Sequence, residues 1–211
     1  MEPTEHNRRA WDEVHRRPER APEPLPDAVR ALLPELRGKH VLHVPCATGE
    51  VTAELVTLGA LVTGVDLSAE SIALAQERAP TAAFVVADVA ELPLQLTRAR
   101  FDVVFAAPLV QRVRNLAPWA ANLASALRPG GVLFAYEDHP VAAAVDGLSH
   151  WRGDYFADHA PWQLGQIVTA VADAGFAVRS LVELSAAHRT QWRKQDPRVP
   201  SRFVVCATKS D

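Results

Sequence analysis

Short apolar runs alternate with amphipathic segments along most of this chain. Apolar runs at 40–45, 61–66, 83–87, 101–105 and 132–136 predict five buried strands, and Pro129-Gly130-Gly131 predicts a turn before the last of them. Between them, apolar side chains recur at helical spacing over about 48–58, 68–78 and 116–127, and again over about 164–175. Two further runs, 176–184 and 203–208, predict strands that complete the sheet. Uniformly apolar strands that alternate with helices predict an α/β fold, a doubly wound and mostly parallel sheet with helices on both faces.

The N-terminal part has a different pattern. Residues 4–16 predict a helix, in which Asn7 and Trp11 share one face. Prolines at 18, 22, 24 and 26 then predict a stiff connector, and apolar spacing over 27–36 predicts a helix leading into the first strand. We therefore divide the chain into 1–26, which either docks on the domain or forms a lid over a ligand, and a main domain, 27–211.

Composition and charge narrow the class of protein. The chain has 211 residues, 48% of them hydrophobic, which fits one α/β domain with a sizeable core. A net charge of -3 provides no general attraction for nucleic acid. Cys46 and Cys206 are too far apart in sequence for a metal or disulfide framework, and no apolar run suggests a membrane span or a signal peptide. We expect a cytoplasmic protein that acts on a small molecule without nucleic acid, membrane or metal, as a monomer or a homodimer.

Three features are predicted to meet at the carboxyl edge of the sheet. A turn of small residues, 45–49, follows the first strand, Asp66 ends the second and Asp88 follows the third. Asp66 lies about 20 residues beyond the turn, the spacing at which a carboxylate accepts hydrogen bonds from ribose hydroxyls. Asp88 is placed to meet an adenine amino group, and Val89 to offer a backbone N–H. Each aspartate alone could simply cap a turn, but the three together favour a nucleoside site.

The ordered motifs resemble those of class I S-adenosylmethionine-dependent methyltransferases. The resemblance rests on VLHVPCATGE, VTGVDLS, FVVADVAELP, FDVVF and LRPGGVLF, in the order and spacing of that family, and it is clearest over residues 38–138. It implies a Rossmann-like sheet of seven strands whose last hairpin is antiparallel. It also implies S-adenosylmethionine as cofactor and S-adenosylhomocysteine as product.

The resemblance assigns roles to residues of this sequence. The turn at Pro45, Cys46, Ala47 and Gly49 would hold the methionine part of the cofactor. Asp66 would hold the ribose, Leu67 would pack on the adenine, and Asp88 and Val89 would read the adenine edge. Ala106 would face the cofactor after the fourth strand, and Trp11 would cover it from the N-terminal segment.

The turn departs from the usual pattern of the family. His43 replaces an acidic residue, and Pro45 and Ala47 replace two glycines. Proline removes a backbone donor, and alanine cannot adopt a positive φ cheaply. One alternative is therefore a non-catalytic domain that keeps the fold with a degenerate turn. A nicotinamide-dependent oxidoreductase is a second alternative, although the chain has no G-x-G-x-x-G turn. For Cys46, no base is evident and we reject a nucleophilic role.

The acceptor side is defined by fewer signals. His139 follows the fifth strand and is the candidate general base, or else a structural histidine. Asn7, Gln111, Trp151 and Tyr155 are the candidate acceptor-binding residues. The chain has no appended substrate domain, which favours a small acceptor over a polymer. Its Ala-, Arg- and Pro-rich composition is typical of high-GC bacteria, whose methyltransferases often decorate specialised metabolites.

Overall fold

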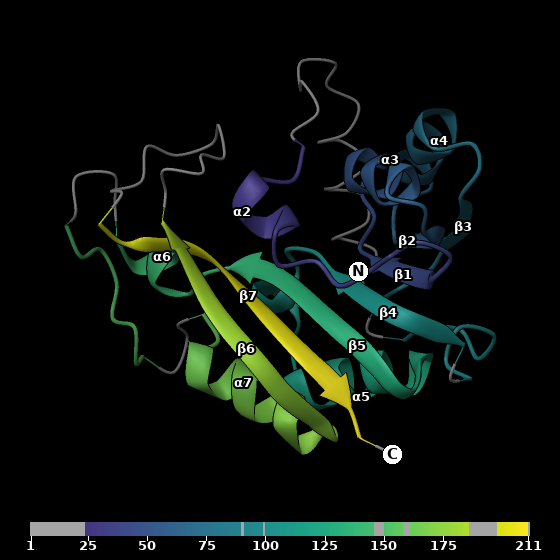
Figure 1. Cartoon of the computed structure of the whole chain (residues 1–211). Coiled ribbons are helices and arrows are strands. Elements are labelled where there is room, and N and C mark those ends of the chain that lie inside the picture. The colour runs from purple at the N-terminus through teal and green to yellow at the C-terminus, as the bar shows by residue number, and fades with distance from the viewer. Residues whose placement is uncertain are drawn as a thin grey trace, which may run out of the picture.

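A computed structural model describes residues 24–89, 91–98, 100–145, 150–157, 161–185 and 198–210. Seven strands form one sheet in the order β3-β2-β1-β4-β5-β7-β6 (Figure 1). The strands are β1 (His40–Val44), β2 (Leu61–Asp66), β3 (Ala83–Val86), β4 (Phe101–Ala106), β5 (Leu127–Asp138), β6 (Phe176–Ser185) and β7 (Pro200–Lys209). β1 to β5 pair in parallel, and β7 pairs antiparallel with both β5 and β6. The predicted fold class, including the antiparallel last hairpin, is confirmed.

Helices cover both faces of this sheet. They are α2 (Asp27–Arg30), α3 (Glu50–Thr57), α4 (Ala69–Arg78), α5 (Leu116–Ala126), α6 (Val141–Ala144) and α7 (Leu164–Asp173), with a 3-10 helix η1 (Val110–Arg112) after β4. Figure 1 shows α5 and α7 together on one face, and α2, α3 and α4 on the other. None of these described helices combines the length and the apolar character needed to span a bilayer.

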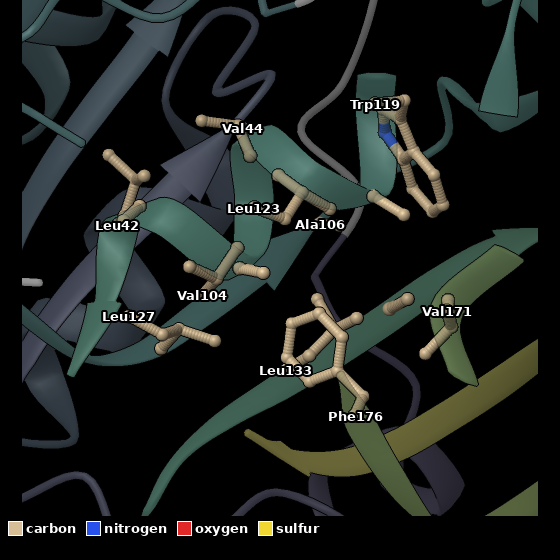
Figure 2. Close-up of a cluster of buried hydrophobic side chains, with 14 of the residues drawn as sticks. Leu42, Val44, Val104, Ala106, Trp119, Leu123, Leu127, Leu133, Val171 and Phe176 are labelled. Atoms are coloured by element: carbon tan, nitrogen blue, oxygen red, sulfur yellow. The ribbon is translucent and has the colours of Figure 1, made fainter. Parts of the chain in front are cut away.

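The core on the α5 and α7 face fixes the orientation of the central strands. Leu42 and Val44 of β1 and Val104 and Ala106 of β4 point toward this side, where they belong to one buried cluster with Trp119 and other residues of α5 and α7 (Figure 2). Alternate residues of the same strands point to the other face. Buried residues on both faces of the sheet therefore hold the carboxyl ends of β1 and β4 side by side. The strand order reverses direction between these two strands.

Two local predictions were wrong. The helix expected over 27–36 is only α2, Asp27–Arg30, followed by turns, because Pro34 has no N–H to donate and disfavours helical geometry at the residue before it. The turn expected at 129–131 is instead a bulge inside β5, where the register with β4 shifts between Phe101 and Val103. Gly130 has a φ of +70° there, so the strand continues through a conformation that glycine permits. The short helix α6 was not predicted.

Candidate active site

The turn after β1 and the end of β2 are joined by hydrogen bonds. The N–H of Ala47 donates to Oδ2 of Asp66 (2.9 Å), and the N–H of Cys46 donates to the carbonyl of Val65 (2.8 Å). Oδ1 of Asp66 accepts from the N–H of Ser68, also at 2.9 Å. Asp66 is only 7% exposed, so its carboxylate is a buried anchor for the turn. The structure thus brings together the turn and the carboxylate that the sequence placed at one edge.

The turn adopts the backbone conformation that its replaced glycine would favour. Ala47 has a φ of +46°, in the left-handed region, and Gly49 has a φ of +85° at the N-cap of α3. Pro45 follows Val44 through a cis peptide bond. A side chain at Gly49 would place its Cβ 2.7 Å from the Cα of Ala75 in α4, so glycine is needed for α3 and α4 to approach. The turn therefore keeps a left-handed backbone at position 47 although this residue is an alanine.

A salt bridge closes the other side of the turn. Nη1 of Arg78, the last residue of α4, contacts Oε1 of Glu50 at 2.7 Å and the carbonyl oxygen of Thr48. The hydroxyl of Thr48 in turn donates to the Glu50 carboxylate, at 2.6 Å to Oε1. These contacts fix the first residues of α3, whose N-terminal backbone N–H groups are directed toward the carboxyl edge of the sheet.

His43 is buried beneath the turn as a neutral imidazole. Burial lowers the pKa of His43 to about 3, so the ring carries no charge at neutral pH. Nδ1 lies 2.8 Å from the hydroxyl oxygen of Thr52 in α3, and the ring packs edge-on to Phe105. Nε2 has no hydrogen-bond partner among the described residues. The acidic residue expected here by resemblance is thus replaced by an uncharged group with one unused polar atom.

Cys46 is not a nucleophile in this arrangement. The residue is 2% exposed, and burial, with a smaller contribution from the Asp66 carboxylate, raises the pKa of its thiol. The thiol therefore stays protonated at neutral pH, whereas a nucleophilic cysteine must reach the thiolate form. Its environment agrees with the rejection of that role.

The remaining predicted cofactor residues lie along the same edge. Leu67 and Asp88 are half-buried, and Val89 is buried. Ala87 donates its N–H to the carbonyl of Asp66 (2.9 Å), which keeps the residues after β3 beside the end of β2. Ala106 is 2% exposed and belongs to the core on the α5 and α7 face. Trp11 and Asn7 lie outside the described residues.

The predicted acceptor residues are distributed over two segments. Gln111, in η1, donates from Nε2 to the carbonyl of Trp162 (3.1 Å). The hydroxyl of Tyr155 accepts from the N–H of Leu164 (3.0 Å), so Tyr155 supports the start of α7. Trp151 is 63% exposed and forms an isolated bridge with Val145. Gln111 and Tyr155 therefore belong to neighbouring segments, η1 and the connector before α7.

His139, the candidate base, has both ring nitrogens engaged. Nδ1 accepts from the N–H of Val141 (3.2 Å), and Nε2 lies 2.8 Å from Oε1 of Glu183 in β6. The side chain is buried, and burial lowers its pKa although Glu183 opposes the shift. A catalytic role for His139 stays a prediction, and it requires Val141 to release Nδ1, because the proton of the neutral ring is then on Nε2, which faces Glu183.

The most unusual side chain at this edge carried no predicted role. Glu137, in β5, is 1% exposed, and its Oε2 accepts from the N–H groups of Leu109 (2.7 Å) and Val110 (3.1 Å). Burial raises the pKa of Glu137 to about 8. The signal in the sequence was a glutamate that directly follows the apolar run of a buried strand, where a charged residue is rare unless it is paired.

These residues fit the cofactor that the resemblance implies. Two carboxylates stand at the ends of neighbouring parallel strands, beside a tight turn that opens a helix, and a buried nitrogen of His43 has no partner in the described part of the chain. Carboxylates accept from ribose hydroxyls and from an adenine amino group, and the turn with the start of α3 suits the polar end of an amino acid. The set is therefore chemically suited to S-adenosylmethionine.

Comparisons with known proteins agree with this site. A family model described as a methyltransferase domain matches residues 41–131. A malonyl-[acyl-carrier protein] O-methyltransferase of Pseudescherichia vulneris is 30% identical over 195 residues, 81% of this chain and 74% of that protein. A ubiquinone biosynthesis O-methyltransferase of Coxiella burnetii is 35% identical over 101 residues, 47% of this chain and 43% of that protein.

A solved structure supports the fold. The S-adenosylmethionine-dependent methyltransferase from Mesorhizobium loti superposes with a TM-score of 0.73 at 23% identity, covering 86% of this chain and 96% of that one. Taken with the relatives in sequence, this places the chain in the class I S-adenosylmethionine-dependent methyltransferase family, as an enzyme that uses S-adenosylmethionine as its methyl donor.

Proposed function

We propose that this protein methylates an oxygen atom of a small-molecule acceptor that binds over the carboxyl ends of β4 and β5. The observation that carries the proposal is the hydrogen bond from Ala47 to Asp66, because it keeps the altered turn and the ribose carboxylate in one site. Both relatives described above are named as O-methyltransferases, one of malonyl-[acyl-carrier protein] and one in ubiquinone biosynthesis, which supports oxygen as the acceptor atom.

On the cofactor side, we assign the roles that the resemblance implies. The turn at Pro45, Cys46, Ala47 and Gly49 binds the methionine part, and Ala106 lies beside it. Asp66 binds the ribose, and Leu67 packs on the adenine. Asp88 and Val89 bind the adenine edge. When bound, S-adenosylmethionine supplies a methyl group on a positively charged sulfur, which is open to in-line attack.

On the acceptor side, the chain's own residues orient the acceptor and exclude water. Gln111 and Tyr155 lie in the two segments that would flank the acceptor, and Trp151 offers an exposed aromatic surface. An acceptor that is already an anion at neutral pH, such as a carboxylate, needs no base, whereas a hydroxyl must lose its proton. For a hydroxyl acceptor, His139 is the group to take that proton, after it exchanges the N–H of Val141 for the acceptor.

The N-terminal segment completes the proposal. Residues 1–26 act as a lid, in which Trp11 covers the cofactor and Asn7 contacts the acceptor. The enzyme works in the cytoplasm in bacterial specialised metabolism, a setting supported by composition alone. A Trp11→Phe variant tests the lid: it should lose most of the change in tryptophan fluorescence that S-adenosylhomocysteine produces in the wild type. An unaltered change would remove Trp11 from the cofactor site.

Calorimetry with S-adenosylhomocysteine tests the proposed site directly. The wild type should bind, and Asp66→Ala should bind more weakly, while Asp173→Ala should match the wild type because Asp173 is exposed at the far end of α7. Release of S-adenosylhomocysteine is then measured with carboxylic acids, phenols and amines as acceptors. Absence of binding at millimolar ligand, or turnover with amines only, would contradict the proposal.

A further inference from the structure

The carboxyl group of Glu137 holds the beginning of η1. Its Oε2 accepts from the N–H groups of Leu109, the N-cap of η1, and of Val110, its first residue. Those two N–H groups lie 28 and 27 residues away in sequence, so the contact ties the loop after β4 to the end of β5. Glu137 is 1% exposed, and its Oε1 is buried without a hydrogen-bond partner among the described residues. Oε2 thus accepts two hydrogen bonds, whereas Oε1 accepts none from the described residues.

The surroundings of Glu137 favour its neutral form. Burial is the largest effect and raises the pKa to about 8; the two N–H donors and Arg202 of β7 act in the opposite direction, and Asp138 adds to the increase. Arg202 is partly neutralised by Asp138, whose Oδ1 lies 3.1 Å from its Nε. Two other titratable side chains of these segments have partners elsewhere: His139 faces Glu183, and Arg112 of η1 reaches the carbonyl of Pro108. Because Oε2 accepts both N–H bonds, the proton of the neutral form resides on Oε1.

η1 is connected in turn to the segment before α7. Gln111 donates to the carbonyl of Trp162 (3.1 Å), and the indole N–H of Trp162 donates to the carbonyl of Val113 (2.8 Å). We call residues 107–113 together with Trp162 the acceptor wall. It is a hydrogen-bonded unit that Glu137 attaches to β5, and the N–H of Ala107 donates to the carbonyl of Val44 in β1 (2.9 Å).

We propose that Glu137 is a positioning residue, which fixes the acceptor wall through its neutral carboxyl group and releases it when that group ionises. The physical reason is that Oε1 is buried without a hydrogen-bond partner among the described residues, so ionisation favours an opened arrangement in which water reaches this oxygen. The name of the wall rests on the function proposed above, whereas the attachment of η1 to Glu137 does not.

Amide hydrogen exchange at residues 109 and 110 tests the proposal without an acceptor. In the wild type, the protection factors of these two amides, corrected for intrinsic exchange, should fall by up to about tenfold per pH unit between pH about 4.5 and about 8, and should level off above that range. Glu137→Gln keeps a neutral acceptor, so its protection should not change with pH. Glu137→Ala should lack the protection at every pH.

Glu54→Gln is the matched control. Glu54 also accepts a backbone N–H from a distant segment, that of Leu25 at 2.9 Å, but it does so on the opposite face of the sheet. This variant should follow the wild-type pH profile at residues 109 and 110. If Glu137→Gln also follows that profile, another group titrates; if Glu137→Ala keeps the protection, Glu137 does not hold η1. Either result overturns the proposal.

Calorimetry with S-adenosylhomocysteine separates this proposal from the proposed function. Glu137→Ala should bind the product within about threefold of the wild type, since the wall lies on the acceptor side. A wild type that does not bind would refute the proposed function and leave the exchange result standing. Loss of binding in Glu137→Ala alone, with wild-type binding intact, would show that Glu137 supports the cofactor side and would overturn the positioning role.

Discussion

Replacing Gly49 by alanine separates two demands on the cofactor turn, a left-handed backbone and a close helix contact. Gly49 has a φ of +85°, and an added Cβ would lie 2.7 Å from the Cα and 2.8 Å from the Cβ of Ala75. Gly38 is the matched control, because its φ is +69° and nothing lies within 4 Å of its would-be Cβ. The two positions share the backbone demand, and only Gly49 has the contact.

The expected losses follow from these two terms. A left-handed alanine costs roughly 1–2 kcal/mol, and a reduced entropy of the unfolded chain offsets about 0.5–1 kcal/mol of that cost. Gly38→Ala should therefore lower the free energy of unfolding by about 0–1.5 kcal/mol. Overpacking against α4 adds about 1–3 kcal/mol at Gly49, for a total of about 1–4.5 kcal/mol.

Urea denaturation measures these losses, and calorimetry with S-adenosylhomocysteine reports the consequence for binding. Because α3 must shift away from α4, Gly49→Ala should weaken binding by about tenfold or more, a loss of roughly 1.4 kcal/mol. Gly38→Ala should bind normally. Equal losses of stability in the two variants would refute the contact with Ala75, and normal binding by a folded Gly49→Ala would refute the role of the turn.

Four further results are expected. Asp66→Ala should weaken S-adenosylhomocysteine binding by about 1–3 kcal/mol in calorimetry, and unchanged affinity would mean that the ribose lies elsewhere. Glu137 binds its proton more tightly in the folded state, so its contribution to stability is complete below pH about 4.5 and is lost as pH rises to about 8. In urea denaturation between these pH values, the Glu137 term should lower the wild-type free energy of unfolding by about 1.4 kcal/mol per pH unit, and Glu137→Gln should not show this decrease. Ala47→Gly should raise the free energy of unfolding by up to about 1 kcal/mol, since glycine relieves the φ of +46°, and a loss would show that this conformation is not strained. The Cys46 thiol should react with a thiol reagent only after denaturation, and rapid labelling of the native protein at Cys46 would contradict its burial.

The sheet was predictable because its strands carry their own signal. A continuous apolar run such as 132–136 has no polar face, which is typical of a strand buried on both sides, and β5 contains this run. The antiparallel pairing of β7 came from the resemblance, because local patterns do not specify strand order. The extension of β5 back to Leu127 was missed, because Pro129 and two glycines read locally as a turn and only pairing with β4 makes them a strand.

The cofactor side of the site was more predictable than the acceptor side. The turn, Asp66 and Asp88 are fixed by position at the ends of successive strands, so their convergence follows from topology. The partners of Glu137 and His139 are backbone and side-chain groups brought near by tertiary packing, and Glu183 lies on the edge strand of the sheet. No spacing along the chain encodes such contacts. The sequence therefore predicted His139 as a base and assigned no role to Glu137.

The altered turn keeps its shape because Asp66 contributes to it as well as to the predicted ribose site. Its two oxygens accept from the N–H groups of Ala47 and Ser68, and each carboxylate oxygen can accept a second hydrogen bond. The bond to Ala47 offsets part of the cost of a left-handed alanine, roughly 1–2 kcal/mol, which is comparable to the net value of a hydrogen bond to a charged group. The uncharged His43 leaves Asp66 as the nearest buried carboxylate in contact with the turn. With two glycines and one acidic residue of the family pattern replaced in this chain, Asp66 stabilises the turn and is also the predicted ribose ligand. Cofactor affinity should therefore depend on Asp66 more than on any other residue of the site.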